Sequence, residues 1–549
     1  MPKRLNYVNI LFWTGVFLFL LLGIDSLIMT YPDEGRNAFA TLYMINSGDL
    51  IVPYYNGEIR YDKPPLLYYT AILMYKFLQI FGFEDLEVSF RLVSIFSTFL
   101  SCLVTFELSK YFIKNRYYQY LSVVIYLGFV NIFIESKAFV PEPLLSLFIN
   151  LSLLSFYKIY QNNQDNNIRT RNLWTYIFWI SIGLGMLAKG VIAFIIVFLV
   201  ICVFLFICKE LHLLKLLFGN PLAFLIGLFI GSGWFILVGI KTHGEFLYQF
   251  FMVHNVGRFT GSSNMHPNPF YFYVIVLLIN LIPLMEIFIL SLISFVTSIK
   301  DRNEIKHMSF LTTYFLAIVI FYSLSTGKVH HYILPSLVPL CILMSFYTEK
   351  TLNTTSKRST LLFILYLLPV IALFIKVPHE FENLKKYLII IFSISPIVYF
   401  ITINIQKGLI LHITALKILV FYIIITISIH DIFPNQKEFI QAIKGKKIFM
   451  VGDISTVSFY NLYVNKSPKT RDIWYVNHNL ILNSEDLSEI RKSLMQNQEV
   501  LIFTKGKYLD TIMKSISEFR QIDSNLEIEI KDMIVAQSKI KVVKISKNN

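Results

Sequence analysis

The sequence predicts a polytopic α-helical membrane protein with about thirteen transmembrane helices and a C-terminal soluble α/β domain. Hydrophobic residues make up 55% of the 549 residues and charged residues only 15%, whereas soluble proteins carry about 25% charged residues. The apolar residues gather in repeated runs of about 20, the length that crosses the hydrocarbon core of a bilayer. From residue 433 onward, shorter runs of mixed character replace them. We therefore expect a transmembrane domain over residues 1–432 and a separate domain over residues 433–549.

The predicted transmembrane helices follow the apolar runs in chain order. They lie near residues 7–30, 87–109, 118–134, 140–158, 173–188, 190–208, 218–240, 269–298, 308–325, 332–348, 360–376, 386–405 and 410–430. The first run is too long for the apolar core of a signal peptide, so we expect an uncleaved span. Ala188–Gly190 interrupts a long apolar stretch and predicts a turn.

The distribution of charge orients these helices. Lysines and arginines give the chain a net charge of +14 and gather in short loops on alternate sides, such as KYFIKNR and SIKDRNEIKH. Cytoplasmic loops of membrane proteins carry this excess of basic residues. We therefore expect a cytoplasmic N-terminus and, after an odd number of spans, a C-terminal domain on the opposite side. This pattern accounts for the basic charge without nucleic acid, which we do not expect as a partner.

The C-terminal domain is predicted from alternating segments. Four β-type runs, KKIFMV, RDIWYV, EVLIFT and KIKVVKI, alternate with segments of helical periodicity, STVSFYNLYV, SEDLSEIRKSLMQ and KYLDTIMKSISEF. Strands that alternate with helices are typical of an α/β domain. It contains no glycine-rich phosphate loop, so nucleotide binding is not predicted.

Two long outside loops, residues 31–86 and 241–268, hold many of the residues that could carry chemistry. The first opens with the adjacent carboxylates Asp33 and Glu34. Locally, Asp33 is predicted to cap the N-terminus of the following helix, and Glu34 to favour its dipole. Capping does not exclude catalysis, so a catalytic carboxylate at the membrane surface stays open as the second interpretation.

Lys63 and Glu142 each lie beside prolines on the same outer face. In YDKPP the prolines hold Lys63 on an extended backbone. Its ammonium is either an interfacial charge that reaches toward water or a fixed group that binds a phosphate. Glu142 stands between Pro141 and Pro143 at the start of a span. An acid there suits the helix dipole, yet an acid at bilayer depth indicates a functional site by default.

Two further outside segments, HNVGRF and STGKVHHYILP, supply cations. Arg258 can form two parallel hydrogen bonds with a phosphate, and Lys328 and Tyr332 can supplement them. The histidines are interpreted as structural because no pair has the spacing of a zinc site: His243, His254, His266, His330 and His331.

A family resemblance joins these segments. YPDEGRNAFATLYMINSGDLIVPYYNGEIRYDKPPLLYY closely resembles the first periplasmic loop of the aminoarabinose-type lipid A glycosyltransferases. These belong to the wider dolichyl-phosphate-mannose/protein mannosyltransferase superfamily, which has the GT-C fold. LGMLAKGVIAF, HNVGRF and FYSLSTGKVHHYILP match further blocks in the right order. The resemblance covers the chain to near residue 430 and implies thirteen spans, a periplasmic α/β domain and a polyprenyl-phosphate sugar donor.

The resemblance also implies roles for single residues. Asp33 matches the key carboxylate of the first loop, with Glu34 as its more expendable neighbour. Lys63 matches the lysine that contacts the donor phosphate, and Arg258 and Tyr332 match residues that line the phosphate site.

Two positions depart from the family pattern. Glu142 stands where the family often has an aspartate before proline, so the charge is kept on a longer arm. Asp62 replaces the commoner glutamate, and with His254 it marks a place where relatives hold a divalent metal ion. The resemblance therefore implies a divalent metal ion at Asp62 and His254.

The function expected is an integral glycosyltransferase of the bacterial inner membrane. It would move a sugar from a polyprenyl phosphate to lipid A on the periplasmic face, with inversion at the anomeric carbon. One alternative keeps the donor and changes the acceptor to a protein hydroxyl or another glycan. Another is a transporter of lipid-linked sugars, which is disfavoured because the charges gather on one face and no internal repeat is found.

Overall fold

The structure is a computed structural model, and it describes most of the transmembrane part and the strands of the C-terminal part. The described residues are 2–25, 32–55, 58–164, 168–261, 267–298, 301–354, 409–432, 447–451, 473–476, 490, 492, 500–504, 509–520, 526–535 and 538–547. The predicted spans 360–376 and 386–405 lie outside them, as do the predicted helix over STVSFYNLYV and most of that over SEDLSEIRKSLMQ.

The chain divides into two compact units. The first comprises Met1–Ile24, Tyr61–Thr70 and Arg91–Ser428. The second comprises Asp25–Arg60, Ala71–Phe90 and Ile429–Asn549.

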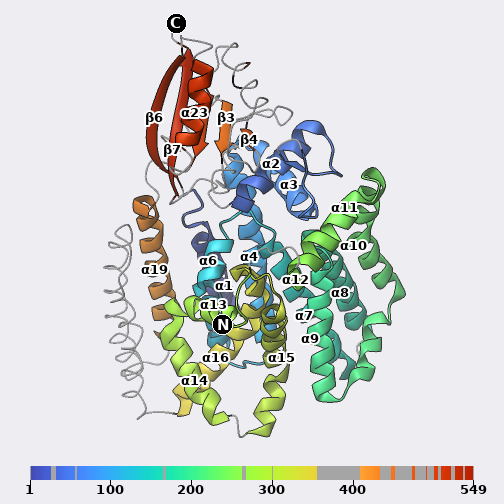
Figure 1. Ribbon diagram of the computed structural model, residues 1–549. Helices are drawn as coiled ribbons and strands as arrows, with labels where there is room; N and C mark the ends of the chain where they lie inside the picture. The colour runs from blue at the N-terminus through green and yellow to red at the C-terminus, as the bar shows by residue number, and fades with distance from the viewer. Residues whose placement is uncertain are drawn as a thin grey trace. The chain divides into compact units, whose positions relative to one another are not determined.

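The first unit is built from helices (Figure 1). Its α-helices are α1 (Pro2–Leu21), α4 (Leu86–Ser109), α5 (Arg116–Gly128), α6 (Val130–Glu135), α7 (Glu142–Gln164), α8 (Ile168–Lys189), α9 (Ile192–Cys208), α10 (Pro221–Lys241), α11 (Glu245–Tyr248), α12 (Gly257–Thr260), α13 (Phe272–Asn280), α14 (Met285–Ser298), α15 (Arg302–Leu324), α16 (Leu337–Thr354) and α19 (Ile410–Ile432). The 3₁₀-helices η1 (Leu211–Phe218), η3 (Ile282–Leu284) and η4 (His330–Ser336) and the π-helix η2 (Gln249–Val256) join them.

Among the described residues, 6 helices are long and apolar enough to cross a membrane, or up to 7 if a bent pair counts as one span. That pair, Phe272–Asn280 and Ile282–Val296, is bent by 51° within the predicted span 269–298. Tyr7–Leu21 and Ile192–Cys208 are shorter apolar helices. The prediction of a polytopic α-helical membrane protein is confirmed.

One predicted span is broken. The run 118–134 forms two helices, because Phe129 adopts an extended backbone (φ −67°, ψ 132°) between Gly128 and Val130. Gly128 packs closely against neighbouring helices, since a Cβ there would lie 2.6 Å from a side-chain carbon of Leu284. The apolar sequence is continuous across the break and gives no sign of it. The break lets α6 carry Glu135 to the end of a separate short helix.

The predicted turn at Ala188–Gly190 is confirmed. Helix α8 ends at Lys189, and Gly190 has φ +84°, a conformation that side chains rarely adopt. A Cβ on Gly190 would also lie 2.7 Å from Cζ of Phe250 in η2. Position 190 therefore requires glycine for two reasons, the positive φ and the close ring of Phe250. This requirement fixes the end of α8 at Lys189.

Helices α8 and α10 approach each other closely at glycines. A Cβ on Gly227 of α10 would lie 2.4 Å from the carbonyl oxygen of Trp179 in α8. Small residues allow such close helix packing in membranes, where van der Waals contact drives association. Figure 1 shows α7, α8, α9 and α10 together in teal and green. This packing holds the end of α8 in place.

The second unit begins with α2 (Pro32–Ser47) and a short antiparallel hairpin, β1 (Tyr54–Tyr55) and β2 (Glu58–Ile59). Arg60 is buried, and its Nη2 donates to Oδ1 of Asn37 at 2.9 Å, which ties the hairpin to α2. Helix α3 (Leu66–Gln79) follows and continues from the first unit into the second.

The C-terminal strands form one sheet in the order β4-β3-β5-β7-β6. They are β3 (Lys447–Val451), β4 (Ile473–Val476), β5 (Val500–Thr504), β6 (Leu526–Val535) and β7 (Ser538–Lys547). β3 pairs in parallel with β4 and β5, whereas β7 is antiparallel to β5 and β6. Helix α23 (Leu509–Arg520) lies beside the sheet in Figure 1 and buries Ile512 and Ile516 in its core. The four predicted strands are confirmed, and β6 is an additional strand.

Candidate active site

Glu142 and Lys189 form an ion pair in the first unit. Glu142 begins α7, and only 4% of its side chain is exposed. Nζ of Lys189, at the end of α8, donates to Oε1 of Glu142 at 2.7 Å. The helix ends fix the positions of both residues, because Glu142 is the first residue of α7, directly after Pro141, and Lys189 is the last residue of α8, directly before Gly190. The pair therefore fixes an ammonium next to a carboxylate in a largely buried place.

Three further side chains join this pair. Nε2 of His331 lies 3.3 Å from the same Oε1 of Glu142. Nζ of Lys189 lies 4.3 Å from the ring centroid of Tyr332, within cation–π range. Lys63 is buried, and its charge interacts favourably with that of Glu142. Lys63, Glu142, His331, Tyr332 and Lys189, named here the cationic cluster, thus come together from four separate segments.

Tyr332 is positioned by the packing of η4. Its ring contacts those of Tyr322 and His331, with each pair of centroids 5.3 Å apart. The hydroxyl of Tyr273 donates to the carbonyl of Val329 at 3.2 Å and holds the backbone that leads into η4. Because η4 packs against α7, the chain brings Tyr332 and His331 to the start of that helix.

Lys328 holds two loops together. Its Nζ donates to the carbonyl oxygen of Asn268 at 2.8 Å and to that of Ser325, while Nδ2 of Asn268 donates back to the carbonyl of Lys328 at 3.1 Å. Burial lowers the pKa of Lys328 by desolvation. In this arrangement the ammonium serves the loop structure, and contact with a donor phosphate stays a prediction.

Three other predicted site residues, Arg258, His254 and Asp62, also belong to the first unit. Arg258 lies on α12, directly after η2, and its side chain is outside those described. His254 lies on η2, and Asp62 lies in the turn before Lys63. The hydroxyl of Tyr61 donates to Oε1 of Glu245 at 2.6 Å, which joins this turn to the segment 241–268. A metal shared by Asp62 and His254 stays a prediction.

Asp33 and Glu34 belong to the second unit. The prediction that Asp33 caps the helix is wrong, because α2 already begins at Pro32 and both carboxylates lie in its first turn. Proline suits the first helical position, since its missing N–H has no partner there. Asp33 is about a third exposed and lies 3.9 Å from Arg36, whereas Glu34 is buried. Both favour the helix dipole, and Asp33 is the more accessible of the two.

The cationic cluster can hold an anion. Lys63 and Lys189 place positive charge beside the Glu142 carboxylate, which is already paired with Lys189 and His331, and the ring of Tyr332 lies against Nζ of Lys189. A carboxylate with these partners is a poor general base, because accepting a proton would weaken both interactions. Glu142 is therefore better suited to orient Lys189 than to remove a proton.

Lys189 and Glu135 are functional candidates that no sequence motif marks. Lys189 lies in AKG, which was interpreted only as a turn, and Glu135 in ESKAFVPEP, which was interpreted as a short loop. A charged residue at the end of an apolar run is itself a signal of function in membrane proteins. That signal applies to both residues, but it does not reveal their partners.

Comparisons with known proteins agree with this architecture. The family model for dolichyl-phosphate-mannose-protein mannosyltransferase matches residues 33–254. An uncharacterised protein of Aquifex aeolicus is 34% identical over 334 residues, which cover 61% of this chain and 71% of that protein. The undecaprenyl phosphate-alpha-4-amino-4-deoxy-L-arabinose arabinosyl transferase of Yersinia pestis is 27% identical over 343 residues, which cover 62% of this chain and 59% of the transferase.

Two solved structures share the fold. The crystal structure of ArnT from Cupriavidus metallidurans bound to undecaprenyl phosphate superposes with a TM-score of 0.74 at 16% identity and covers 98% of this chain and 97% of that one. The apo form gives a TM-score of 0.73 at the same identity and covers 99% and 98%. The similarity extends through both the transmembrane helices and the C-terminal part.

Proposed function

Because this chain belongs to the GT-C glycosyltransferase superfamily, we propose that it transfers a sugar from a polyprenyl phosphate to lipid A on the periplasmic face of the bacterial inner membrane. The cationic cluster supports the proposal. Lys63 and Lys189 both interact electrostatically with the Glu142 carboxylate, and Lys189 also lies against the ring of Tyr332. A phosphate headgroup is the anion that such a cluster suits, while its lipid tail stays in the bilayer.

The proposed reaction is a direct displacement. The acceptor oxygen bonds to the anomeric carbon as the bond to the phosphate oxygen breaks, and the polyprenyl phosphate leaves with the bonding electrons. Negative charge grows on the departing phosphate. Lys63, Tyr332 and Arg258 stabilise that charge, with Lys189 held beside them by Glu142, and fixed donors of this kind lower the barrier most. The anomeric configuration is inverted.

Asp33 orients the acceptor in this proposal. When the acceptor is a hydroxyl, Asp33 removes its proton, whereas an acceptor phosphate is already anionic and needs no base. The role rests on the resemblance of the first loop, and the exposure of Asp33 at the start of α2 is consistent with it. Glu34 is buried and supports the helix rather than the acceptor.

The mass of lipid A tests the proposal. A deletion strain, complemented with wild type or with Lys63→Ala, is compared with its parent by mass spectrometry of extracted lipid A. The expected result is a sugar-sized mass increment in the parent and the wild-type complement only. Lys215→Met, an exposed lysine far from the cluster in sequence, serves as the matched control and keeps the increment. An unchanged lipid A in the deletion strain rules out this acceptor.

A second acceptor class is favoured by the family match, since the matching model describes protein mannosyltransferases. In that case the donor and the cationic cluster are the same, and the acceptor is a protein hydroxyl or another glycan. Lipid A is then unchanged on deletion, while glycoprotein staining of membrane and periplasmic fractions loses bands. The two readouts separate the acceptors without changing the assignment of the donor site.

A further inference from the structure

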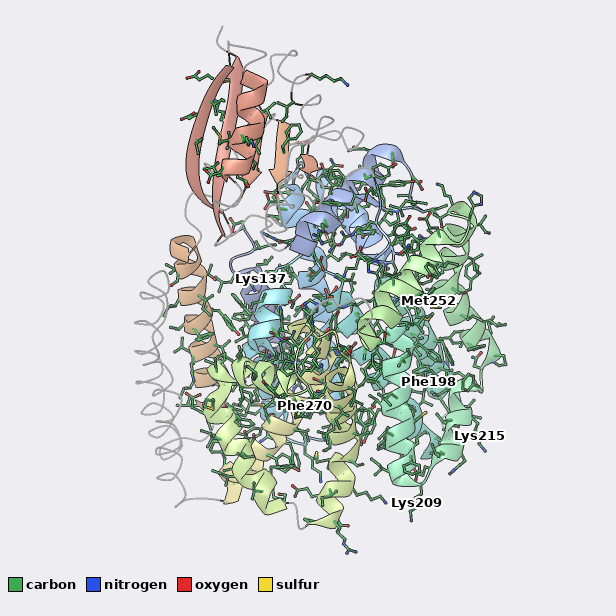
Figure 2. All side chains as sticks on the ribbon, viewed as in Figure 1. Lys137, Phe198, Lys209, Lys215, Met252 and Phe270 are labelled. Atoms are coloured by element: carbon green, nitrogen blue, oxygen red, sulfur yellow. The ribbon has the colours of Figure 1, made fainter. Side chains whose placement is uncertain are left out.

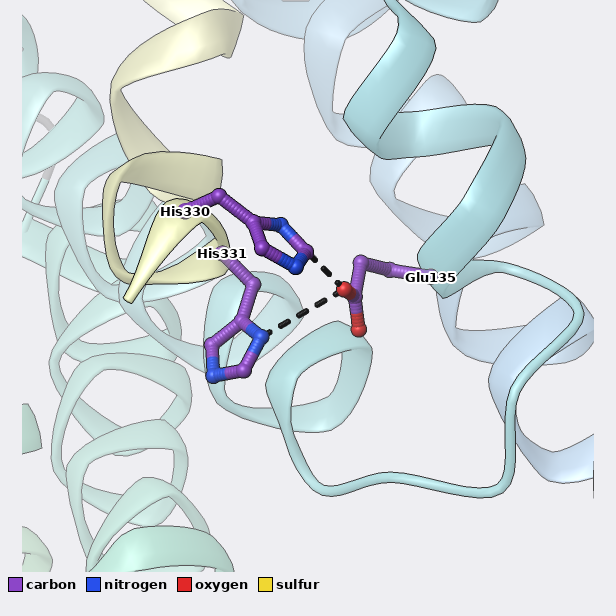
Figure 3. A group of neighbouring side chains, drawn as sticks. All are labelled: Glu135, His330 and His331. Atoms are coloured by element: carbon purple, nitrogen blue, oxygen red, sulfur yellow. Dashed lines mark ion pairs between the residues drawn. The ribbon is translucent and has the colours of Figure 1, made fainter. Parts of the chain in front are cut away.

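Glu135, His330 and His331 form a compact group at the end of α6 and the start of η4 (Figure 3). One ligand atom from each lies within 4.8 Å of the others. Oε1 of Glu135 lies 3.4 Å from Nδ1 of His331 and 3.7 Å from Nδ1 of His330. Figure 3 shows both imidazole rings turned toward the same carboxylate.

The carboxylate of Glu135 is incompletely satisfied. Only 1% of its side chain is exposed, and its Oε2 has no hydrogen-bond partner among the described residues. A buried carboxylate oxygen without a partner costs free energy, so the site favours an additional cation.

We propose that Glu135, His330 and His331 bind a divalent transition-metal ion, with Zn²⁺ as the best match. Two imidazole nitrogens and one carboxylate form a ligand set that Zn²⁺ prefers, with a fourth position open to water. Bonds of about 2.0–2.1 Å in a tetrahedron separate neighbouring ligand atoms by about 3.3 Å. Two of the three separations here, 3.4 and 3.7 Å, are already close to that value.

The far side of His331 supports the assignment. Its Nε2 lies 3.3 Å from Oε1 of Glu142. An imidazole that binds a metal commonly donates its other N–H to a carboxylate, which fixes the tautomer and the ring orientation. With the proton on Nε2, the lone pair of Nδ1 points to the ion. The ion would thus pin η4 to α6 and hold His331 against Glu142.

The site is open on the side of His330. His330 keeps 36% of its side chain exposed, while His331 keeps 6%. An ion can therefore enter past His330. This arrangement differs from the ion predicted at Asp62 and His254, and it gives His330 and His331 a role other than the structural one expected from the sequence. Spacing between histidines does not reveal this group, because Glu135 lies far from both in the sequence.

Metal content of the full-length protein tests the proposal. The detergent-solubilised protein, free of any polyhistidine tag, is stripped with EDTA and dialysed against Zn²⁺, and bound zinc is counted by mass spectrometry. We expect about one Zn²⁺ per chain in the wild type and an affinity loss of about tenfold or more in His330→Ala. Because His330 is partly exposed, this substitution preserves the fold, which size-exclusion chromatography verifies.

Two controls locate the ion. His212→Ala removes an exposed histidine elsewhere, and His254→Ala removes the other predicted ligand; both are expected to keep the zinc. Zn²⁺ should also raise the unfolding temperature of the wild type but not that of His330→Ala. A wild type without zinc, or full zinc binding by His330→Ala, overturns the proposal. Since the readout is metal content, failure here is distinguishable from failure of the proposed transfer reaction.

Discussion

Lys189 and Glu142 are 47 residues apart in the chain, yet their Nζ and Oε1 atoms lie 2.7 Å apart at the meeting of two helix ends. The ion pair is largely buried, with 16% of the Lys189 side chain and 4% of that of Glu142 exposed. It connects the turn at Gly190 with the proline-flanked start of α7. We infer that the pair fixes the orientation of the ammonium that also faces the ring of Tyr332.

Substitution of either partner should lower sugar transfer. We expect Lys189→Met and Glu142→Gln each to reduce kcat/KM by about 10²-fold, the usual effect of losing one fixed charge near a reacting phosphate. The double variant should be little worse than either single one, because both remove the same interaction. Purified protein in proteoliposomes with a polyprenyl-phosphate sugar gives the rates, and Lys215→Met is the control. Losses that multiply in the double variant would contradict the coupling.

The buried ion pair between Lys417 of α19 and Glu286 of α14 should make stability depend on keeping or removing both partners together. Both side chains are 5% exposed, and Nζ of Lys417 contacts both carboxylate oxygens. Removing one partner leaves a buried charge, so Lys417→Met should cost about 3–5 kcal/mol. The double variant Lys417→Met, Glu286→Leu should recover most of this loss. Thermal unfolding in detergent measures whether the double variant is more stable than Lys417→Met. Equal stabilities of the two variants would refute the prediction.

Local patterns predicted most of the architecture, because transmembrane helices and buried strands are marked by their own composition. The runs at Lys447–Val451 and Val500–Thr504 are examples, since both form strands in the centre of the sheet. β6 was not predicted, because Leu526–Val535 mixes charged and apolar residues, as expected for a strand at the edge of a sheet. The break at Phe129 left no trace in the apolar sequence.

The site could be predicted only in part, because its interactions join distant segments. Lys63, Glu142 and Tyr332 were identified by motif, and the structure brings them together with Lys189. No periodicity connects Glu142 with Lys189. In the same way, His330 and His331 form a possible ligand group only together with Glu135, which α6 places opposite them.

Lys137 should make stability depend on pH. It lies beside α6 (Figure 2), and burial lowers its pKa to about 7, although its Nζ lies 3.7 Å from the ring centroid of Phe133. Below pH 7 the Lys137 ammonium is charged in both the folded and the unfolded chain, and the folded chain bears the full free-energy cost of burying that charge. As pH rises from about 7 toward 10, the unfolded chain keeps the proton that the folded chain loses, so stability increases.

Lys137→Met removes this charge. It should therefore raise the unfolding temperature more at pH 6 than at pH 9, as followed by thermal unfolding in detergent. Lys215, whose exposed side chain projects from the protein in Figure 2, gives the control Lys215→Met, with no such difference. Equal effects of Lys137→Met at both pH values would show that the lysine is solvated.

Gly190→Ala should disturb the cationic cluster through the backbone alone. The substitution meets two obstacles, the positive φ of +84° and the ring of Phe250 at 2.7 Å. Together they should cost about 1–3 kcal/mol and shift Lys189 away from Glu142, so transfer falls although no charged group is lost. The double variant Gly190→Ala, Phe250→Ala separates the two causes. Gly190→Ala should lower activity less in the Phe250→Ala background than in the wild type, because the clash is gone and only the strain in φ remains. Full activity of Gly190→Ala in the proteoliposome assay would mean that the turn does not position Lys189.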